Sequence, residues 1–282
     1  MERSAFNLMR PSRHASGLRF ACCGIAQEAP DLRFPGVAGS RCSVVVVVEG
    51  RLELFCGGVR YRLGVGDGFV IRPDAAVVCR PYGDGDSRCL LWGFDGDAEY
   101  YLSALGLGSG HDVFHVRDCR PLLDLTDKGL RHVGGGVVDE LRLHALAHEF
   151  VVALSGELEV NDALARREVA ASRSEAVDLA MRYIAANYAG RCSVAEVAAY
   201  CGVDRSHLSR EFRHEVGMTV KECVDRLRIA KACDLLAFTA MSVSAVSRAC
   251  GYGSADAFEA RFKSAWGMTP GSFRRKADDR FT

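Results

Sequence analysis

The chain contains 282 residues, of which 49% are apolar and 26% are charged, and its 36 basic and 36 acidic side chains give a net charge of zero. This length predicts two domains of about 100–200 residues each, and the composition excludes a disordered, collagen-like or coiled-coil protein. The neutral total argues against a polybasic nucleic-acid binder over the whole chain, although a basic module diluted by an acidic one has the same total.

The N-terminus lacks the continuous apolar segment of a signal peptide, and no apolar run approaches the roughly 18 residues of a membrane-spanning helix. We therefore expect a cytoplasmic protein with no membrane partner. The 12 cysteines include no Cys-x-x-Cys pair, so in a reducing compartment we interpret them as free thiols that pack as small apolar groups. Charge also divides the chain, because the part before Ser174 is acidic overall and the part after it is basic.

Residues 41–95 are predicted to form short strands separated by glycine-containing turns, a pattern typical of a barrel or sandwich. The apolar runs are Val44–Val48, Leu52–Phe55, Val59–Leu63, Phe69–Ile71, Val77–Cys79 and Leu90–Phe94. A small barrel can enclose one ligand, and the candidate ligand contacts are Arg33, Arg41, Tyr82 and Trp92. An arginine can bind a carboxylate or phosphate, and a tryptophan can stack on a ring. The alternative is that Trp92 belongs to the core and that the arginines are solvated.

From about Val137 the periodicity becomes helical, after a hinge of three glycines. His144 and His148 lie one turn apart, with Glu140 one turn before them, and this spacing could hold a metal ion. No further set of ligands is evident elsewhere in the sequence, so we favour a packing role for the two histidines. An apolar stripe suited to another helix, and hence to self-association, runs along Leu141, Ala145, His148 and Val152. The polar residues 156–173 are interpreted as a linker.

The C-terminal part contains an internal repeat, which is the most informative feature of the sequence. Val197–Val203 matches Val246–Tyr252 at an offset of 49, and Phe212–Thr219 matches Phe262–Thr269 at an offset of 50. Each copy reads as a short helix, a glycine turn and a second helix, and Ser193 is placed to cap the first of these helices. This is the pattern of a helix-turn-helix, whose second helix lies in the major groove of DNA.

A single copy would be explained equally well by an ordinary helical hairpin, but two copies with the same glycine and core spacing favour two DNA-reading units. Residues 228–236 between them predict an amphipathic connecting helix. A rigid connector that holds the units about 34 Å apart lets both enter successive major grooves on one face of the duplex. The candidate DNA-binding residues are Arg205, Ser206, His207, Ser209 and Arg210 in the first unit, and Ser254, Ala255, Asp256, Glu259, Arg261 and Lys263 in the second.

The last hundred residues resemble the DNA-binding domain of the AraC/XylS-type (arabinose-operon regulator) family of bacterial transcription factors. The matching residues are Leu208, Arg210, Phe212, Gly217, Arg228, Ala232, Leu235, Leu236, Gly251, Tyr252, Phe258, Phe262, Lys263, Gly267, Pro270, Phe273 and Arg274. Residues 44–54, 57–73 and 92–96 resemble, more weakly, the cupin-like effector domain common in this family. The resemblance implies double-stranded DNA, a small-molecule effector and a second copy of the chain as partners, with RNA polymerase as a further candidate.

The expected fold class is therefore α+β with two domains. Residues 1–155 are expected to form a cupin-like β-barrel with flanking helices, which binds the effector and mediates dimerisation. Residues 174–282 are expected to form an all-helical domain with two helix-turn-helix units joined by a long helix.

The second unit departs from the family pattern. The family usually has Phe-x-Arg-x-Phe where this chain has Phe258 to Phe262, so Ala260 stands at the position equivalent to Arg210. Asp256 and Glu259 are then expected to face the groove, where carboxylates are unfavourable near phosphates, although a carboxylate can accept from cytosine N4. We expect the second unit to contribute less sequence preference than the first.

Two other function classes were weighed. Enzymatic cupins bind a metal through a His-x-His pair and a downstream Glu or Gln, but residues 41–95 contain no histidine, so we expect no enzyme and no cofactor. The alternative is a cupin-type enzyme with an accessory helical domain. A third interpretation is a protein-interaction module whose helix-turn-helix units no longer read DNA. Where sugar-sensing relatives often have His or Tyr, the chain has Val77, Val78 and Cys79, which predicts a pocket more apolar than a sugar site.

Overall fold

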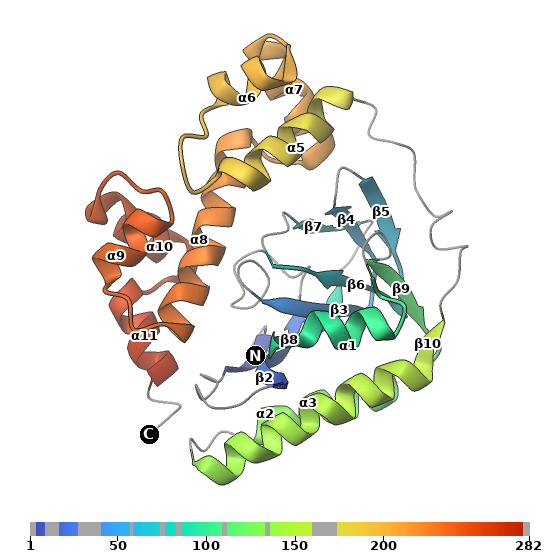
Figure 1. Ribbon diagram of the computed structural model, residues 1–282. Helices are drawn as coiled ribbons and strands as arrows, with labels where there is room; N and C mark the ends of the chain where they lie inside the picture. The colour runs from blue at the N-terminus through green and yellow to red at the C-terminus, as the bar shows by residue number, and fades with distance from the viewer. Residues whose placement is uncertain are drawn as a thin grey trace.

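A computed structural model describes residues 4–8, 17–27, 41–56, 59–73, 77–82, 86–108, 112–132, 136–159 and 174–278. A strand-rich N-terminal domain is followed by a helical C-terminal domain (Figure 1), which confirms the expected two-domain α+β architecture. None of the helices within these ranges combines the length and the hydropathy that crossing a bilayer requires.

Within the described residues, the N-terminal domain contains two antiparallel sheets and three helices. Its elements are β1 (Ser4–Leu8), β2 (Leu18–Gln27), β3 (Cys42–Glu49), β4 (Leu52–Cys56), β5 (Val59–Leu63), β6 (Asp67–Ile71), β7 (Val77–Pro81), β8 (Arg88–Gly96), α1 (Ala98–Ala104), β9 (Val113–Val116), α2 (Arg120–Arg131), α3 (Val137–Glu157) and β10 (Leu158–Glu159). The large sheet has the strand order β1-β2-β8-β3-β6-β9-β10, and the small sheet has the order β5-β4-β7.

Alternation along the strands gives the large sheet two buried faces. On β3, Val45 and Val47 face the small sheet and pack with Leu52 and Leu54 of β4. The intervening valines of β3 face the other way and pack with Trp92 of β8 and with the apolar sides of α2 and α3. Burial on both faces explains why this strand is a continuous valine run and not an alternation of apolar and polar residues.

The structure extends the N-terminal domain beyond the predicted strands and the predicted boundary at residue 155. Strands β1, β2 and β9 and helices α1 and α2 lie outside the segments that the sequence pattern singled out. Helix α3 continues to Glu157, and Leu158 and Glu159 then pair with β9. These backbone hydrogen bonds make residues 156–159 part of the domain, whereas residues 160–173 of the expected linker lie outside the described residues.

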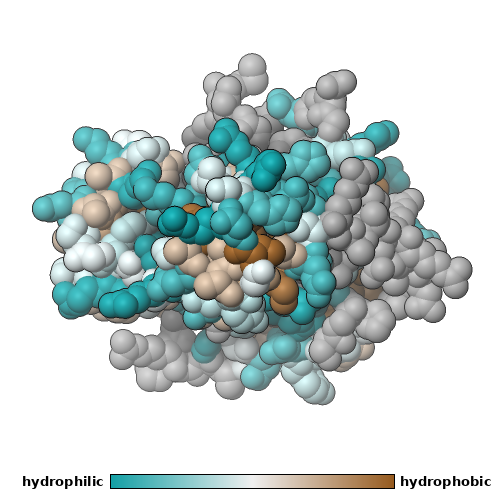
Figure 2. All heavy atoms as spheres, turned by 90° about the horizontal axis from the view of Figure 1, so that it is seen from above, coloured by the Kyte–Doolittle hydropathy of each residue, from teal (hydrophilic) through white to brown (hydrophobic). Residues whose placement is uncertain are grey.

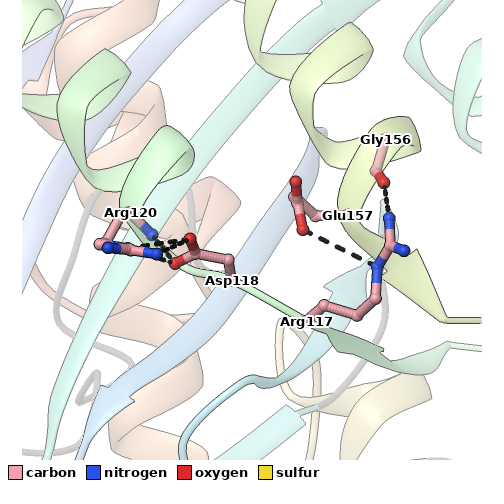
Figure 3. A network of polar contacts seen from close by, with 5 residues as sticks. All are labelled: Arg117, Asp118, Arg120, Gly156 and Glu157. Atoms are coloured by element: carbon pink, nitrogen blue, oxygen red, sulfur yellow. Dashed lines mark hydrogen bonds and ion pairs between the residues drawn. The ribbon is translucent and has the colours of Figure 1, made fainter.

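The end of α3 is anchored to the segment that follows β9 (Figure 3). Arg117 donates from Nη2 to the carbonyl oxygen of Gly156, and its Nε lies 3.9 Å from Oε2 of Glu157. Next to it, Arg120 at the start of α2 pairs with Asp118 at 2.7 Å, and these hydrogen bonds lower the pKa of the Asp118 carboxyl. An arginine at the carbonyl end of α3 complements the helix dipole and fixes the direction in which the outer face of α3 points.

The C-terminal domain is entirely helical and contains the predicted repeat. Its helices are α5 (Glu175–Asn187), α6 (Val194–Cys201), α7 (Arg205–Val216), α8 (Val220–Phe238), α9 (Val243–Ala249), α10 (Ala255–Trp266) and α11 (Pro270–Asp278). The pairs α6–α7 and α9–α10 are the two helix-turn-helix units, and α8 is the expected connecting helix. The predicted cap at Ser193 is confirmed as a capping box with Glu196, and Gly202 ends α6 with a φ of +69°, which a glycine adopts without strain.

Candidate nucleic-acid interface

The first candidate reading helix, α7, has one buried and one exposed face. Leu208 and Phe212 are fully buried, whereas all five candidate residues of this helix, Arg205, Ser206, His207, Ser209 and Arg210, are exposed. Asp204 caps the helix by accepting a 2.7 Å hydrogen bond from the backbone nitrogen of Ser206. Backbone hydrogen bonds hold the pKa of the Asp204 carboxyl below its usual value. The helix start is therefore fixed, and its outward side chains project into solvent.

The second candidate reading helix, α10, repeats this geometry with different side chains. Phe258 and Phe262 are fully buried, and the candidates Ala255, Asp256, Glu259, Arg261 and Lys263 are exposed. Ser254 caps the helix, and its hydroxyl accepts a hydrogen bond from the backbone nitrogen of Ala257 at 3.2 Å. The Ser254 hydroxyl oxygen therefore already accepts a hydrogen bond from the first turn of α10.

The two reading helices can be compared position by position at the offset of 50. With about 100° of rotation per residue, Arg210 lies opposite the buried Leu208 and Phe212, at the centre of the outward face. The equivalent position on α10 is Ala260, and Ser206 is replaced by Asp256. The outward face of α10 thus carries an acid and a methyl group where α7 carries a hydroxyl and a guanidinium.

One exposed basic position is shared by both helices, but only its second copy, Lys263, was among the candidates from the sequence. Arg213 lies one turn after Arg210 and is exposed, as is Lys263 at the equivalent position of α10. The i+3 spacing from Arg210 is the signal that could have found Arg213. Arg261, by contrast, has Nη2 3.6 Å from Oδ2 of Asp225 on α8. This ion pair directs Arg261 toward the connecting helix and away from the centre of the outward face.

The two units are joined by more than the connecting helix. Arg228 on α8 donates from Nε to the carbonyl oxygen of Tyr188 at 2.6 Å and from Nη2 to that of Gly190 at 2.8 Å, both beyond the end of α5. The same guanidinium lies 5.6 Å from the ring centroid of Tyr252, in the turn of the second unit. One side chain of the connecting helix therefore contacts both the segment that leads from α5 into the first unit and the turn of the second unit.

The turn of the second unit also approaches the end of α5 closely. Gly251 has a φ of +80°, and a Cβ atom there would lie 2.5 Å from the carbonyl oxygen of Ala189. Only glycine fits this approach without a shift of the backbone. Together with Arg228, this contact holds the second unit against the end of α5. Seen from above, the described surface is hydrophilic in many places, and apolar residues gather near its centre (Figure 2).

The described candidate effector residues, Arg41, Tyr82 and Trp92, lie in different surroundings. Trp92 is fully buried, stacks on Phe150 at 4.6 Å between ring centroids and donates from Nε1 to the Thr126 hydroxyl at 2.8 Å. Its ring lies on the side of the large sheet that faces α2 and α3. This placement corrects the expectation of a ring-stacking effector contact and matches the alternative of a core residue, because no surface of the indole is open to a ligand.

Arg41 and Tyr82 make their contacts with other residues of the N-terminal domain. Arg41 is 8% exposed and donates from Nε to Oδ1 of Asp95 at 2.6 Å. Tyr82 lies next to the small sheet, with the guanidinium of Arg62 4.3 Å from its ring centroid. Arg33 lies outside the described residues. Arg41 is a buried cation, and an anionic ligand that bound it would compete with Asp95.

The space between the two sheets is filled by apolar and thiol side chains. The described residues that face it include Cys22, Val45, Val47, Leu52, Leu54, Leu63, Phe69, Ile71, Val77, Cys79, Cys89 and Leu91, each at most 5% exposed. Burial raises the pKa of the Cys22 and Cys89 thiols to about 12. These thiols remain protonated at neutral pH and lack the nucleophilic thiolate form.

The two histidines of α3 have packing roles. His144 accepts a 3.0 Å hydrogen bond at Nδ1 from the backbone nitrogen of Phe20, and its Nε2 lies 3.6 Å from Oε1 of Glu140. Burial lowers the pKa of His144, against the opposing effect of Glu140. His148 bonds through Nδ1 to the carbonyl oxygen of His144 and contacts the edge of Tyr101. Over the described ranges, no three histidine, cysteine, aspartate or glutamate side chains group as a metal site.

The predicted apolar stripe of α3 lies on its outer face. Leu141 is 63% exposed and Val152 is 69% exposed, and Ala145 and His148 lie between them on the same face and are also exposed. Val137 and Val138 extend the stripe toward the start of the helix and are likewise exposed. The opposite face of α3 is buried against the large sheet, so the stripe is an unpartnered apolar surface.

Comparison with known proteins supports both domains. Residues 19–162 match the family model described as AraC-like ligand binding domain, and residues 178–276 match the one described as helix-turn-helix domain. The xylose operon regulatory protein of Escherichia coli (strain K12) is 35% identical over 99 residues, which are 35% of this chain and 25% of that protein. The chain thus spans about a quarter of the length of this relative.

A longer but weaker similarity covers both domains. The lactose operon transcription activator of Staphylococcus xylosus is 22% identical over 255 residues, which are 89% of this chain and 90% of that protein. The crystal structure of apo ToxT K231A from Vibrio cholerae strain SCE256 is 12% identical, covers 98% of both chains and has a TM-score of 0.41.

Proposed function

The chain belongs to the AraC family of transcription regulators, and from this premise we propose that it binds DNA in a sequence-specific manner and regulates transcription in response to a small molecule. The observation that carries the proposal is the outward face of α7. Its cations Arg210 and Arg213 are exposed on a helix whose opposite side is fixed by fully buried residues, and Arg205 is exposed at the start of the helix. Exposed arginines on a rigid second helix of a helix-turn-helix are suited to bind base edges and phosphates in the major groove.

We propose unequal roles for the two reading helices. Arginine binds guanine through two hydrogen bonds, so Arg210 is the proposed principal base contact of α7. Ala260 at the equivalent position of α10 has no donor, and the exposed acids Asp256 and Glu259 oppose approach to phosphates. The second helix then adds affinity mainly through Lys263 and backbone amides at its start.

The test is selection of a duplex by the full-length chain from a random library, followed by titration of the selected and a scrambled duplex at several salt concentrations. Sequence-specific regulators typically prefer their site by about 10³-fold or more. A preference of this kind supports the proposal. Equal, weak binding of both duplexes, or none, supports the interaction-module interpretation instead. The family consists of transcription regulators, so the cupin-type enzyme is not retained.

We further propose that the protein is a homodimer formed through the outer face of α3. A 21-residue helix is about 31 Å long, and its exposed apolar stripe can pair with the same stripe of a second copy about a two-fold axis. Such pairing would cover apolar side chains that are otherwise left in water.

Sedimentation of the full-length chain at micromolar concentration tests the dimer. Leu141→Glu and Val152→Glu place charges in the stripe and should give a monomer. Arg142→Ala, beside the stripe on the same helix, should leave the dimer intact. A monomeric wild type, or dimeric stripe variants, contradicts the proposal.

The remaining proposals concern the effector, RNA polymerase and the cellular compartment. Of the effector candidates, Arg41 is retained as a proposed contact for an anionic group, and Tyr82 and Arg33 are retained as further candidates. Thermal denaturation with a panel of small carboxylates and phosphates, repeated on Arg41→Ala, tests this, because a bound ligand raises the midpoint. RNA polymerase is a proposed partner at the bound promoter, and a regulator of this kind is proposed to act in the cytoplasm.

A further inference from the structure

A side chain of the N-terminal domain contacts the end of the first reading helix. Arg60 on β5 donates from Nη2 to the backbone carbonyl oxygen of Glu215 at 3.3 Å, and the same nitrogen lies 3.5 Å from Oε2 of that residue. Glu215 is the penultimate residue of α7. The small sheet lies beneath the α5–α7 part of the helical domain (Figure 1). The two residues are 155 positions apart in the chain.

Two buried carboxylates, one from each domain, flank this arginine. Glu53 on β4 is 1% exposed and Glu215 is 3% exposed, and Nη1 of Arg60 lies 3.8 Å from Oε1 of Glu53. A buried carboxylate without a cation is costly, and removing one partner of a buried pair leaves an uncompensated charge. Arg60 therefore neutralises charge on both sides of the domain boundary.

Apolar packing accompanies the charged contact. Phe55 is 6% exposed, and the Arg60 guanidinium lies 4.8 Å from its ring centroid. Phe55 and Glu53 are two residues apart on β4 and so project from the outer face of the small sheet, opposite to Leu54. One continuous apolar cluster includes Phe55 together with Val216 at the end of α7.

We propose that Arg60 is a positioning residue, which holds the C-terminal end of α7 against the outer face of the small sheet and thereby couples the N-terminal domain to the first reading helix. The inference rests on the proposed function of α7 as a DNA reader. The last carbonyl groups of a helix lack partners within the helix and form the negative end of its dipole, so a guanidinium there stabilises the helix end. Arg205 and Arg210 on the same helix stay exposed, so the contact orients α7 without covering its outward face.

Arg62 offers a matched control. It lies on the same strand and the same face as Arg60, and its Nε is also 3.8 Å from Oε1 of Glu53. Its side chain is 42% exposed, against 18% for Arg60, and its ring contact is with Tyr82 of the N-terminal domain. Arg62→Ala therefore perturbs Glu53 and the surface charge of β5 without removing the contact with Glu215.

Hydrogen–deuterium exchange on the full-length chain tests the contact without DNA. Charged hydrogen bonds are worth more than neutral ones, and we expect Arg60→Ala to speed exchange of the last-turn amides of α7 by about tenfold. Arg62→Ala should leave those amides unchanged, and Arg60→Lys should give an intermediate effect. Equal effects of Arg60→Ala and Arg62→Ala would overturn the proposal. If Arg60→Ala does not fold, Arg60→Lys and Glu215→Gln supply the same comparison.

A second measurement distinguishes coupling from local stabilisation. Coupling between two sites is reciprocal, so binding of the duplex selected by the full-length protein should slow exchange in β4 and β5 of the wild type and of Arg62→Ala. In Arg60→Ala this effect of DNA on β4 and β5 should be lost although the duplex still binds. Retention of the effect in Arg60→Ala, or its absence in the wild type, refutes coupling through Arg60. If no duplex is selected, the proposed DNA-binding function fails, and the DNA-free comparison still decides the contact.

Discussion

Arg210→Ala removes the guanidinium at the centre of the outward face of α7. Arg210 is exposed, and alanine is at least as favourable as arginine in a helix, so folding stability should change by less than about 0.5 kcal/mol. A lost bidentate contact with guanine costs about 1–3 kcal/mol, which is roughly a 5- to 150-fold loss of affinity for the selected duplex. The loss should be confined to binding, and the preference at one or two base pairs should relax.

Fluorescence anisotropy with the selected and the scrambled duplex, at four salt concentrations, separates base reading from phosphate binding. If Arg210 reads a base, only the affinity for the selected duplex falls. Arg213→Ala, one turn further along the exposed face, is the comparison for the loss of a phosphate contact. That loss should weaken binding to both duplexes and reduce the magnitude of the salt slope by about 0.9. Unchanged affinity of Arg210→Ala, or equal losses on both duplexes, would refute the assignment of Arg210 as a base reader.

Three further outcomes are expected. Ala260→Arg should raise affinity for the selected duplex by up to about 1–3 kcal/mol, because it adds the missing donor to α10; no change would show that this position does not limit the second unit. Arg228→Lys keeps the charge but loses the fork that reaches both Tyr188 and Gly190, so it should weaken binding to a duplex with both half-sites by about tenfold while sparing a single half-site. Because burial lowers the pKa of His144 below 6.5, the unfolded chain takes up its proton first as the pH falls. Thermal stability should therefore lose a contribution below about pH 6.5 that a His144→Asn variant does not lose, and equal pH profiles would contradict this.

The helical domain was predictable because its signals are local. Each signal lies within a short segment of the chain, and both copies of the repeat contain it. Examples are the cap Ser193, the turn glycine Gly202 and the buried pair Leu208 and Phe212. The connecting helix followed from the same periodicity. The 3.6-residue period of an α-helix was sufficient to predict which residues of α7 and α10 point outward, apart from Arg213.

The sheets were harder to read because both faces of the large sheet are buried. Alternation separates Trp92 from Leu91, but apolar residues occupy both sides, so periodicity alone does not say which side faces the small sheet. The choice of Trp92 as an effector contact failed for that reason. Strand β2 was missed because its cysteines, alanine and glycine carry little strand preference.

Contacts between the domains were beyond any sequence argument. Arg60 and Glu215 are 155 positions apart, and each looks like an ordinary surface charge in its own segment. Only the arrangement of the domains shows that both belong to a buried cluster. The same holds for Arg228, whose place in the family pattern was visible but whose hydrogen bonds to the end of α5 were not.

The differences between the two reading helices also bear on how one chain is oriented on DNA. Two equal units on a rigid connector could bind a site with two similar half-sites in either direction. Here Ala260 and Asp256 of α10 occupy the positions equivalent to Arg210 and Ser206 of α7. Arg213 and Lys263, which are also equivalent, are both basic. We expect the shared cations to give both units affinity for phosphate, and the unlike positions to give only the first a strong base contact. Arg228 and Gly251 hold the second unit against the end of α5. We therefore expect the first unit's choice of bases to determine where the second unit lies, and to give the chain a defined direction along the duplex.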